Sequence, residues 1–218
     1  MNTNLGALST PKALNGLNGL NGLNAEAVRG SVAVVRRLTP ADLSRPTPCA
    51  DWTLADLLAH MTVQHRGFAA AARGDGQDLA HWAQRPLAKD PVADYADAAD
   101  DVLAAFASVD RPDRPFALPE FKAAQTFPAL HAIGFHFIDY VVHGWDVART
   151  LDLPYAPDPA LLEAALPIAH AVPSGDDYRL APGSAFAPPL QAGDGGSLLD
   201  RILTTLGRSP SWSPACPS

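Results

Sequence analysis

The chain has 218 residues, of which 47% are apolar and 18% charged, so it can bury a sizeable core. Its net charge of −7 and the lack of a basic cluster argue against a nucleic-acid partner. No apolar run is long enough for a membrane span, no secretory signal opens the sequence, and two cysteines are too few for a disulfide framework. We therefore expect a soluble cytoplasmic protein that acts on a small molecule. Whether it forms a homodimer is left open.

The first segments along the chain are a low-complexity stretch and a helix. A Leu-Asn-Gly repeat runs from Leu14 to Asn24, and Asn and Gly are poor formers of helices and strands. We expect residues 1–23 to be a disordered tail, with a packed arm or a partner-binding segment as the alternative. The first helix is predicted over residues 24–38, with Asn24 as its N-cap.

Apolar residues at helical spacing predict further helices. These helices begin at Thr53, Asp90, Pro128, Asp158 and Ser197. The one over about 128–151 is apolar on most sides and should be the buried one. A short extended piece is expected near Phe116 to Leu118, but no segment shows strong strand alternation. The predicted fold is therefore all-α, a four-helix bundle with additional C-terminal helices over residues 24–213, followed by a tail over 214–218.

Three residues from two predicted helices form the strongest chemical pattern. Asp139 and His143 are four residues apart, so their side chains stack on one helix face. His60 lies on the apolar side of an earlier helix, and antiparallel packing would bring it to that pair. Two imidazoles and one carboxylate make a three-ligand metal site with open positions. The alternative for Asp139 and His143 is a plain i,i+4 hydrogen bond, although an unpaired carboxylate in an apolar helix would be costly.

Four other residues of the long helix are candidates for the surroundings of this site. His136 lies three residues before Asp139, and it could be a fourth ligand, a substrate contact or a donor to a ligand. We assign His136 the catalytic proton transfer. Asp146 is expected to orient a metal ligand. Trp145 and His131 are the expected substrate contacts, with core packing as the alternative for Trp145.

The two cysteines are expected to be incidental to the chemistry. Cys49 could be a reactive thiol, but a free cysteine is more often a small buried apolar residue. Cys216 lies in a Pro- and Ser-rich tail.

Two motifs of the sequence resemble those of a known family. One runs Pro46-Thr47-Pro48-Cys49-Ala50-Asp51-Trp52-Thr53 and continues to His60, and the other runs from Asp139 through His143-Gly144-Trp145-Asp146 to Arg149. They resemble the DinB-like metal-binding superfamily and, within it, the N-terminal domain of mycothiol-dependent maleylpyruvate isomerase and its short actinobacterial relatives. The segment from Leu198 to Trp212 is similar to the close of those relatives, so the resemblance covers about residues 25–213.

The resemblance implies a DinB-like four-helix bundle that holds a divalent metal through His60, Asp139 and His143. Zn²⁺ is the expected ion and mycothiol the expected cosubstrate of a thiol transferase or isomerase. The alternatives are a metal-dependent hydrolase, lyase or biosynthetic tailoring enzyme without a thiol, and a non-catalytic metal-binding or sensor protein. The maleylpyruvate isomerases carry Glu at the position of Asp139, and a separate C-terminal domain that we expect to have no counterpart here.

Overall fold

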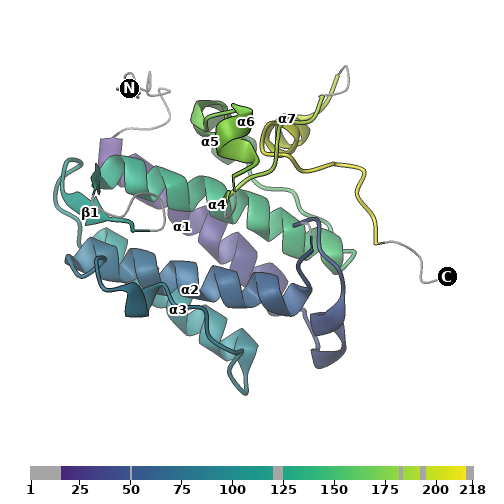
Figure 1. Cartoon of the computed structure of the whole chain (residues 1–218), viewed down its shortest axis with the longest axis horizontal. Helices are drawn as coiled ribbons and strands as arrows, with labels where there is room; N and C mark the ends of the chain where they lie inside the picture. The colour runs from purple at the N-terminus through teal and green to yellow at the C-terminus, as the bar shows by residue number, and fades with distance from the viewer. Residues whose placement is uncertain (1–15, 50, 120–124, 182–183, 192–194, 215–218) are drawn as a thin grey trace.

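Four long helices dominate the computed structural model, which describes residues 16–49, 51–119, 125–181, 184–191 and 195–214. They are α1 (Gly16–Val35), α2 (Leu54–Arg73), α3 (Pro91–Ala107) and α4 (Ala129–Thr150). α1 packs chiefly on α4 and α2 chiefly on α3, while α2 and α4 touch more sparsely (Figure 1). The prediction of an all-α four-helix bundle is therefore confirmed.

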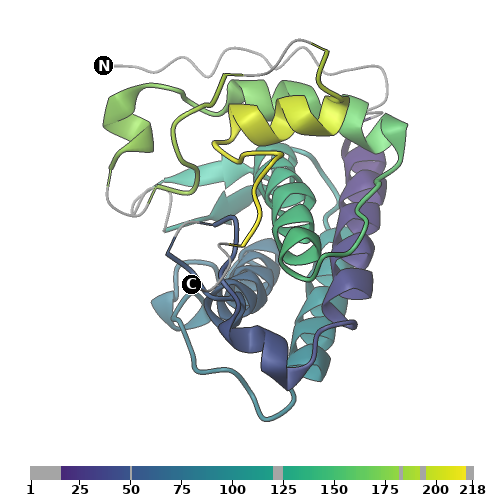
Figure 2. The same cartoon turned by 90° about the vertical axis from the view of Figure 1, so that its right-hand side faces the viewer.

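Smaller elements cover the ends and one side of the bundle. The 3₁₀ helices η1 (Pro40–Ser44) and η2 (Leu79–His81) lie in loops, and β1 (Pro115–Ala117) pairs antiparallel with β2 (Thr126–Pro128). The extended piece predicted near Phe116 is thus present, and β2 is its unpredicted partner. The C-terminal helices α5 (Pro159–Ala171), α6 (Asp176–Arg179) and α7 (Leu198–Thr205) follow α4. Figure 2 shows α5 and α7 together on one side of the four long helices.

The helix starts follow local capping chemistry. Thr53 and Asp56 form a capping box, in which the Asp56 backbone N–H donates to Thr53 Oγ1 (3.3 Å) and the Thr53 N–H donates to Asp56 Oδ2 (3.0 Å). Ser197 and Asp200 repeat the arrangement at α7. Asp90 caps α3 with proline at the first helical position. Because these contacts are short-range, the sequence predicts the start of each of these helices.

The expected boundary of the N-terminal tail is wrong. α1 begins at Gly16 and not near Asn24, and Asn24 is a buried interior residue instead of the N-cap. The three-residue repeat is close to the helical period, so Leu17 and Leu20 both reach the core, where they are 9% and 2% exposed. Their burial outweighs the poor helix propensity of Asn and Gly. Residues 1–15 of the predicted tail lie outside the described residues.

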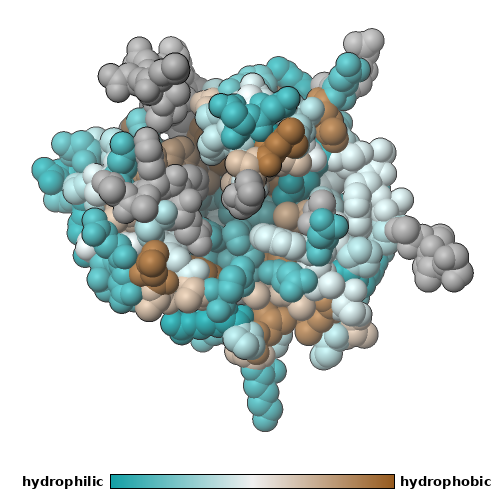
Figure 3. Space-filling model, viewed as in Figure 1, coloured by the Kyte–Doolittle hydropathy of each residue, from teal (hydrophilic) through white to brown (hydrophobic). Residues whose placement is uncertain are grey.

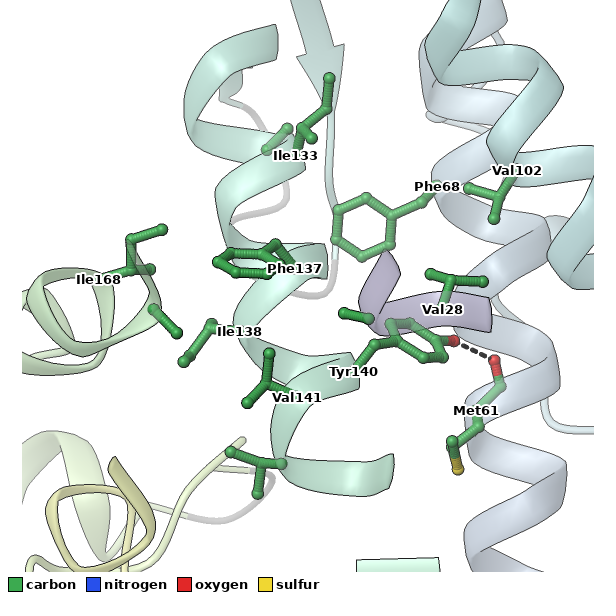
Figure 4. Close-up of a cluster of buried hydrophobic side chains, with 14 of the residues drawn as sticks. Val28, Met61, Phe68, Val102, Ile133, Phe137, Ile138, Tyr140, Val141 and Ile168 are labelled. Carbon is green, nitrogen blue, oxygen red and sulfur yellow. Dashed lines mark hydrogen bonds between the residues drawn. The ribbon is translucent and has the colours of Figure 1, made fainter. Parts of the chain in front are cut away.

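α4 is buried on more than one side, as its composition predicts. Figure 4 shows Ile138 facing Ile168 of α5, and Tyr140 facing α2, where its hydroxyl donates to the Met61 carbonyl. Of the helices that the structure describes, none combines the length and apolarity that a bilayer span needs.

Candidate metal centre

His60 of α2 and the pair Asp139 and His143 of α4 lie together between the two helices. Each offers one donor atom, and the three atoms lie within 4.8 Å of one another. His143 Nε2 is 3.3 Å from Asp139 Oδ1. His60 and Asp139 are partly exposed, whereas His143 is 2% exposed. In the view of Figure 3 the surface is hollowed between α4 and α2, and hydrophilic residues line this hollow.

Asp146 and Arg208 hold His143 in one orientation. His143 Nδ1 donates to Asp146 Oδ2 at 2.9 Å, which leaves Nε2 directed toward Asp139. The Arg208 Nε lies 3.1 Å and 3.3 Å from the two carboxylate oxygens of the fully buried Asp146. Arg208 comes from the segment after α7, so the C-terminal part of the chain supports the site. Asp146 therefore has the position expected of a residue that orients a metal ligand.

The charges of the three donors differ in a way that suits a cation. Burial lowers the pKa of His60 to about 4, and the nearby charge of His143 adds to that, so His60 is neutral at pH 7. Burial acts to raise the pKa of Asp139, but His143 outweighs it and brings that pKa down to about 2. Burial also acts to lower the pKa of His143, but Asp139 and Asp146 raise it to about 9. A proton on His143 thus sits between two carboxylates, in a place where a cation could replace it.

The donor set fits a divalent ion such as Zn²⁺. Metal–ligand bonds of about 2.0–2.2 Å in a tetrahedral site put neighbouring donors roughly 3.4 Å apart. The 3.3 Å between His143 Nε2 and Asp139 Oδ1 already has that spacing. The widest separation, within 4.8 Å, would close with a side-chain shift of roughly 1 Å. Three protein donors leave room for a further ligand.

His136 does not fit the catalytic role that we expected for it. It is fully buried, its Nδ1 donates to Asn24 Oδ1 (2.8 Å), and its Nε2 lies 3.1 Å from His65 Nδ1. Both ring nitrogens are therefore used inside the core, and the ring packs edge-on against Phe68. Burial lowers the pKa of His136 to about 3, so it is neutral at pH 7. The spacing to Asp139 is correct for one helix face, but that face also meets α1 and the core.

The expected substrate contacts are also misplaced. Trp145 is 7% exposed and belongs to the hydrophobic core, which was its alternative assignment. His131 lies twelve residues before His143, or roughly 18 Å along the helix axis, too far for a shared contact. The aromatic ring at the site is instead Trp52, whose centroid lies 4.8 Å from that of His60. Trp52 belongs to the motif that precedes α2, and helical periodicity gives no information about residues outside a helix.

Two further residues of the motifs have structural explanations. Gly144 is required because a Cβ there would lie 2.7 Å from the hydroxyl of Tyr155, which donates to the Val141 carbonyl. Cys49 Sγ accepts from Arg208 Nη2 at 3.2 Å, and burial raises the pKa of its thiol to about 12. Cys49 is therefore a protonated thiol outside the donor cluster. Cys216 lies outside the described residues.

The chain is similar to known proteins in sequence and in fold. Residues 25–148 match the model of a family described as mycothiol maleylpyruvate isomerase N-terminal domain. Two uncharacterized proteins of Mycobacterium tuberculosis, MT0763 of strain CDC 1551 and Rv0738 of strain H37Rv, are each 27% identical to the chain over 182 residues. Each match covers 81% of this chain and 91% of the relative.

A solved structure shares the fold. The crystal structure of the mycothiol-dependent maleylpyruvate isomerase aligns with a TM-score of 0.58 and 14% identity, over 90% of this chain and 91% of that chain. The alignment therefore spans nearly all of both chains, and it shows a shared fold.

Proposed function

We propose that this chain, which belongs to the family of mycothiol maleylpyruvate isomerase N-terminal domains, is a metal-dependent enzyme that acts with a low-molecular-weight thiol. His60, Asp139 and His143 are the proposed ligands, Zn²⁺ the proposed ion, and mycothiol the first thiol to test. The observation that carries the proposal is the convergence of these three donors, from two helices, within 4.8 Å.

A divalent ion bound by these residues would supply the Lewis acidity that lets a thiol ligand lose its proton near neutral pH. The neutral imidazole of His60 offers a lone pair without prior deprotonation, because burial holds its pKa near 4. Asp139 contributes the charge that balances the ion. His60 and Asp139 are partly exposed, so the proton of an incoming thiol has a path to water. The proposed reaction class is thiol transfer to an electrophile, or a thiol-assisted isomerisation.

Two further side chains fix the orientation of His143. Its Nδ1 is held by Asp146, and Asp146 is held by Arg208, so its Nε2 keeps a single direction. A ligand whose orientation is set before binding loses less conformational entropy on binding. This chain of contacts supports a site built for an ion over a plain ion pair between Asp139 and His143.

The test is metal content followed by thiol binding. We expect about one divalent ion per chain by elemental analysis of the purified protein, and its loss in His60→Ala. His81→Ala is the matched control, because His81 lies in η2 and pairs with Asp75 away from the site. A wild-type protein that takes up no divalent ion would contradict the proposal.

Thiol use is tested on the Co²⁺-substituted protein. Mycothiol should produce a sulfur-to-metal charge-transfer band, and His143→Ala should abolish it. A Co²⁺ spectrum that responds to no thiol at millimolar concentration would leave metal-activated water as the chemistry of the site.

A further inference from the structure

A pocket of about 510 Å³ opens beside the candidate metal centre. The segment that leads into α2 and the first turns of α2 form one wall, and the loop after η2 forms the other. Trp52 and Ala59 line the first wall, and Gln84, Arg85 and Leu87 line the second. None of the predicted site residues lies in this pocket, so the sequence patterns gave it no role.

The pocket and the metal centre share a wall. The ring of Trp52 lies 4.8 Å from the ring of His60 at an angle of 52°, so Trp52 borders both. Asp56 and Ala59 also line the pocket, and they precede His60 by one helical turn and by one residue. A molecule attached to the metal centre by one end can therefore place its other end against Trp52.

The pocket lining has two carboxylates, Asp51 and Asp56, and one guanidinium, Arg85, so its net charge is −1. Asp51 and Arg85 carry opposite charges, and the Arg85 guanidinium also donates to the Ala80 carbonyl at 3.2 Å. The Asp56 carboxylate is used by the capping box of α2, where it accepts from the Thr53 N–H and hydroxyl. An anionic ligand therefore finds no net positive field here.

The remaining groups suit a neutral polar ring. Within the described part of the chain, neither the Asp51 carboxylate nor the Gln84 amide has a hydrogen-bond partner. Between them they offer acceptors and an N–H₂ donor, which are the partners that hydroxyl groups use. The half-buried Trp52 adds a flat apolar face on which the C–H face of a sugar-like ring can lie.

We propose that this pocket binds the uncharged, hydroxyl-rich part of the thiol cosubstrate, with Trp52 as the stacking surface and Asp51 and Gln84 as hydrogen-bonding partners. The proposal rests on the proposed function, since it places the thiol end at the metal centre. It makes the pocket the feature that selects a glycosylated thiol, such as mycothiol, over an anionic peptide thiol such as glutathione.

The first experiment compares long and short thiols on the full-length Co²⁺ protein. Mycothiol should bind at least tenfold more tightly than 2-mercaptoethanol, and glutathione should show no such gain. Gln84→Ala and Trp52→Ala should each weaken mycothiol binding by roughly three- to tenfold, as expected for one lost polar or stacking contact. Gln84→Ala should leave 2-mercaptoethanol binding within twofold of the wild type.

Gln77→Ala is the matched control, because Gln77 is an exposed glutamine outside the pocket. Trp52 packs against the ring of His60, whereas Gln84 does not. The Gln84 variant therefore tests pocket binding without disturbing the metal centre. Equal binding of mycothiol and 2-mercaptoethanol by the wild type, or full mycothiol affinity in both pocket variants, would overturn the proposal.

The second experiment needs no metal. The thiol-free sugar portion is titrated into metal-free protein by calorimetry in its uncharged, N-acetylated form, N-acetylglucosaminyl-inositol. Binding that is weakened by Trp52→Ala and by Gln84→Ala would support the pocket assignment. This holds even if no thiol perturbs the Co²⁺ spectrum, because a silent spectrum would contradict only the proposed function. Absence of binding at millimolar concentration would overturn the pocket assignment.

Discussion

The guanidinium of Arg208 holds the carboxylate of Asp146 from a position 62 residues later in the chain, with its Nε 3.1 Å and 3.3 Å from the two oxygens. Both side chains are buried, Asp146 completely and Arg208 to 4% exposure. Because Asp146 in turn accepts from His143 Nδ1, the contact joins the segment after α7 to the candidate metal centre. Two consequences can be measured, one in stability and one in metal affinity.

Arg208→Met should lower the free energy of unfolding by about 3–5 kcal/mol, because it leaves the Asp146 carboxylate buried without its cation. It should also weaken metal binding by about 10–100-fold, because His143 loses the contact that fixes its ring. Denaturant titration and competition with a chromophoric chelator measure the two effects. Arg208→Lys keeps the charge and should recover part of both, whereas unchanged metal affinity in Arg208→Met would refute the positioning role.

The carboxylate of Asp139 should matter through its charge more than its length. Asp139→Glu should retain the metal, because a longer side chain can still reach donors that lie within 4.8 Å of one another. Asp139→Asn should lose it, because a charged ligand becomes a neutral one. Metal analysis of the two variants provides the check. A greater loss in Asp146→Asn than in Asp139→Asn would move the carboxylate ligand to Asp146.

The Leu-Asn-Gly repeat should contribute to stability. Leu20 is 2% exposed in α1, so Leu20→Ala should lower the free energy of unfolding by about 2–5 kcal/mol. Asn18 is an exposed residue of the same repeat, and Asn18→Ala should change stability by no more than about 0.5 kcal/mol. Chemical denaturation at pH 7 compares them. Equal stability of both variants with the wild type would argue that the start of α1 is not packed in solution.

The buried pair His65 and His136 should make the protein acid-sensitive. Burial lowers the pKa of both, that of His136 to about 3, against about 6.5 in the unfolded chain. Below pH 6.5 the two histidines bind protons in the unfolded state but not in the folded state. The free energy of unfolding therefore decreases as the pH falls from 6.5 toward 3. Each histidine adds up to about 1.4 kcal/mol per pH unit to this slope.

Between pH 6.5 and 4.5, His136→Gln should reduce the slope of the unfolding free energy against pH by about the contribution of one histidine. Denaturant titrations at several pH values give the slope for both proteins. His170→Gln, at an exposed position of α5, should keep the wild-type slope. An identical slope in His136→Gln would mean that His136 takes up a proton in the folded state as readily as in the unfolded chain.

Short-range interactions in the sequence determine where several helices begin and which residues share a helix face. Capping at Thr53, Asp90 and Ser197 sets where three helices begin, because the partners lie within four residues. The pair Asp139 and His143 faces one way because four residues make about one helical turn. These features could be predicted without knowing how the helices pack.

The tertiary structure alone decided which other side chains reach the site. His136 has the right spacing to Asp139, yet packing against α1 and the core turns it toward Asn24 and His65. Arg208 approaches Asp146 from 62 residues later in the chain, and Trp52 approaches His60 from the loop before α2. Helical spacing predicts neither contact. The repeat in α1 is helical because its leucines find a core to bury in. Spacing along one helix specifies a face, but only packing between helices determines what that face meets.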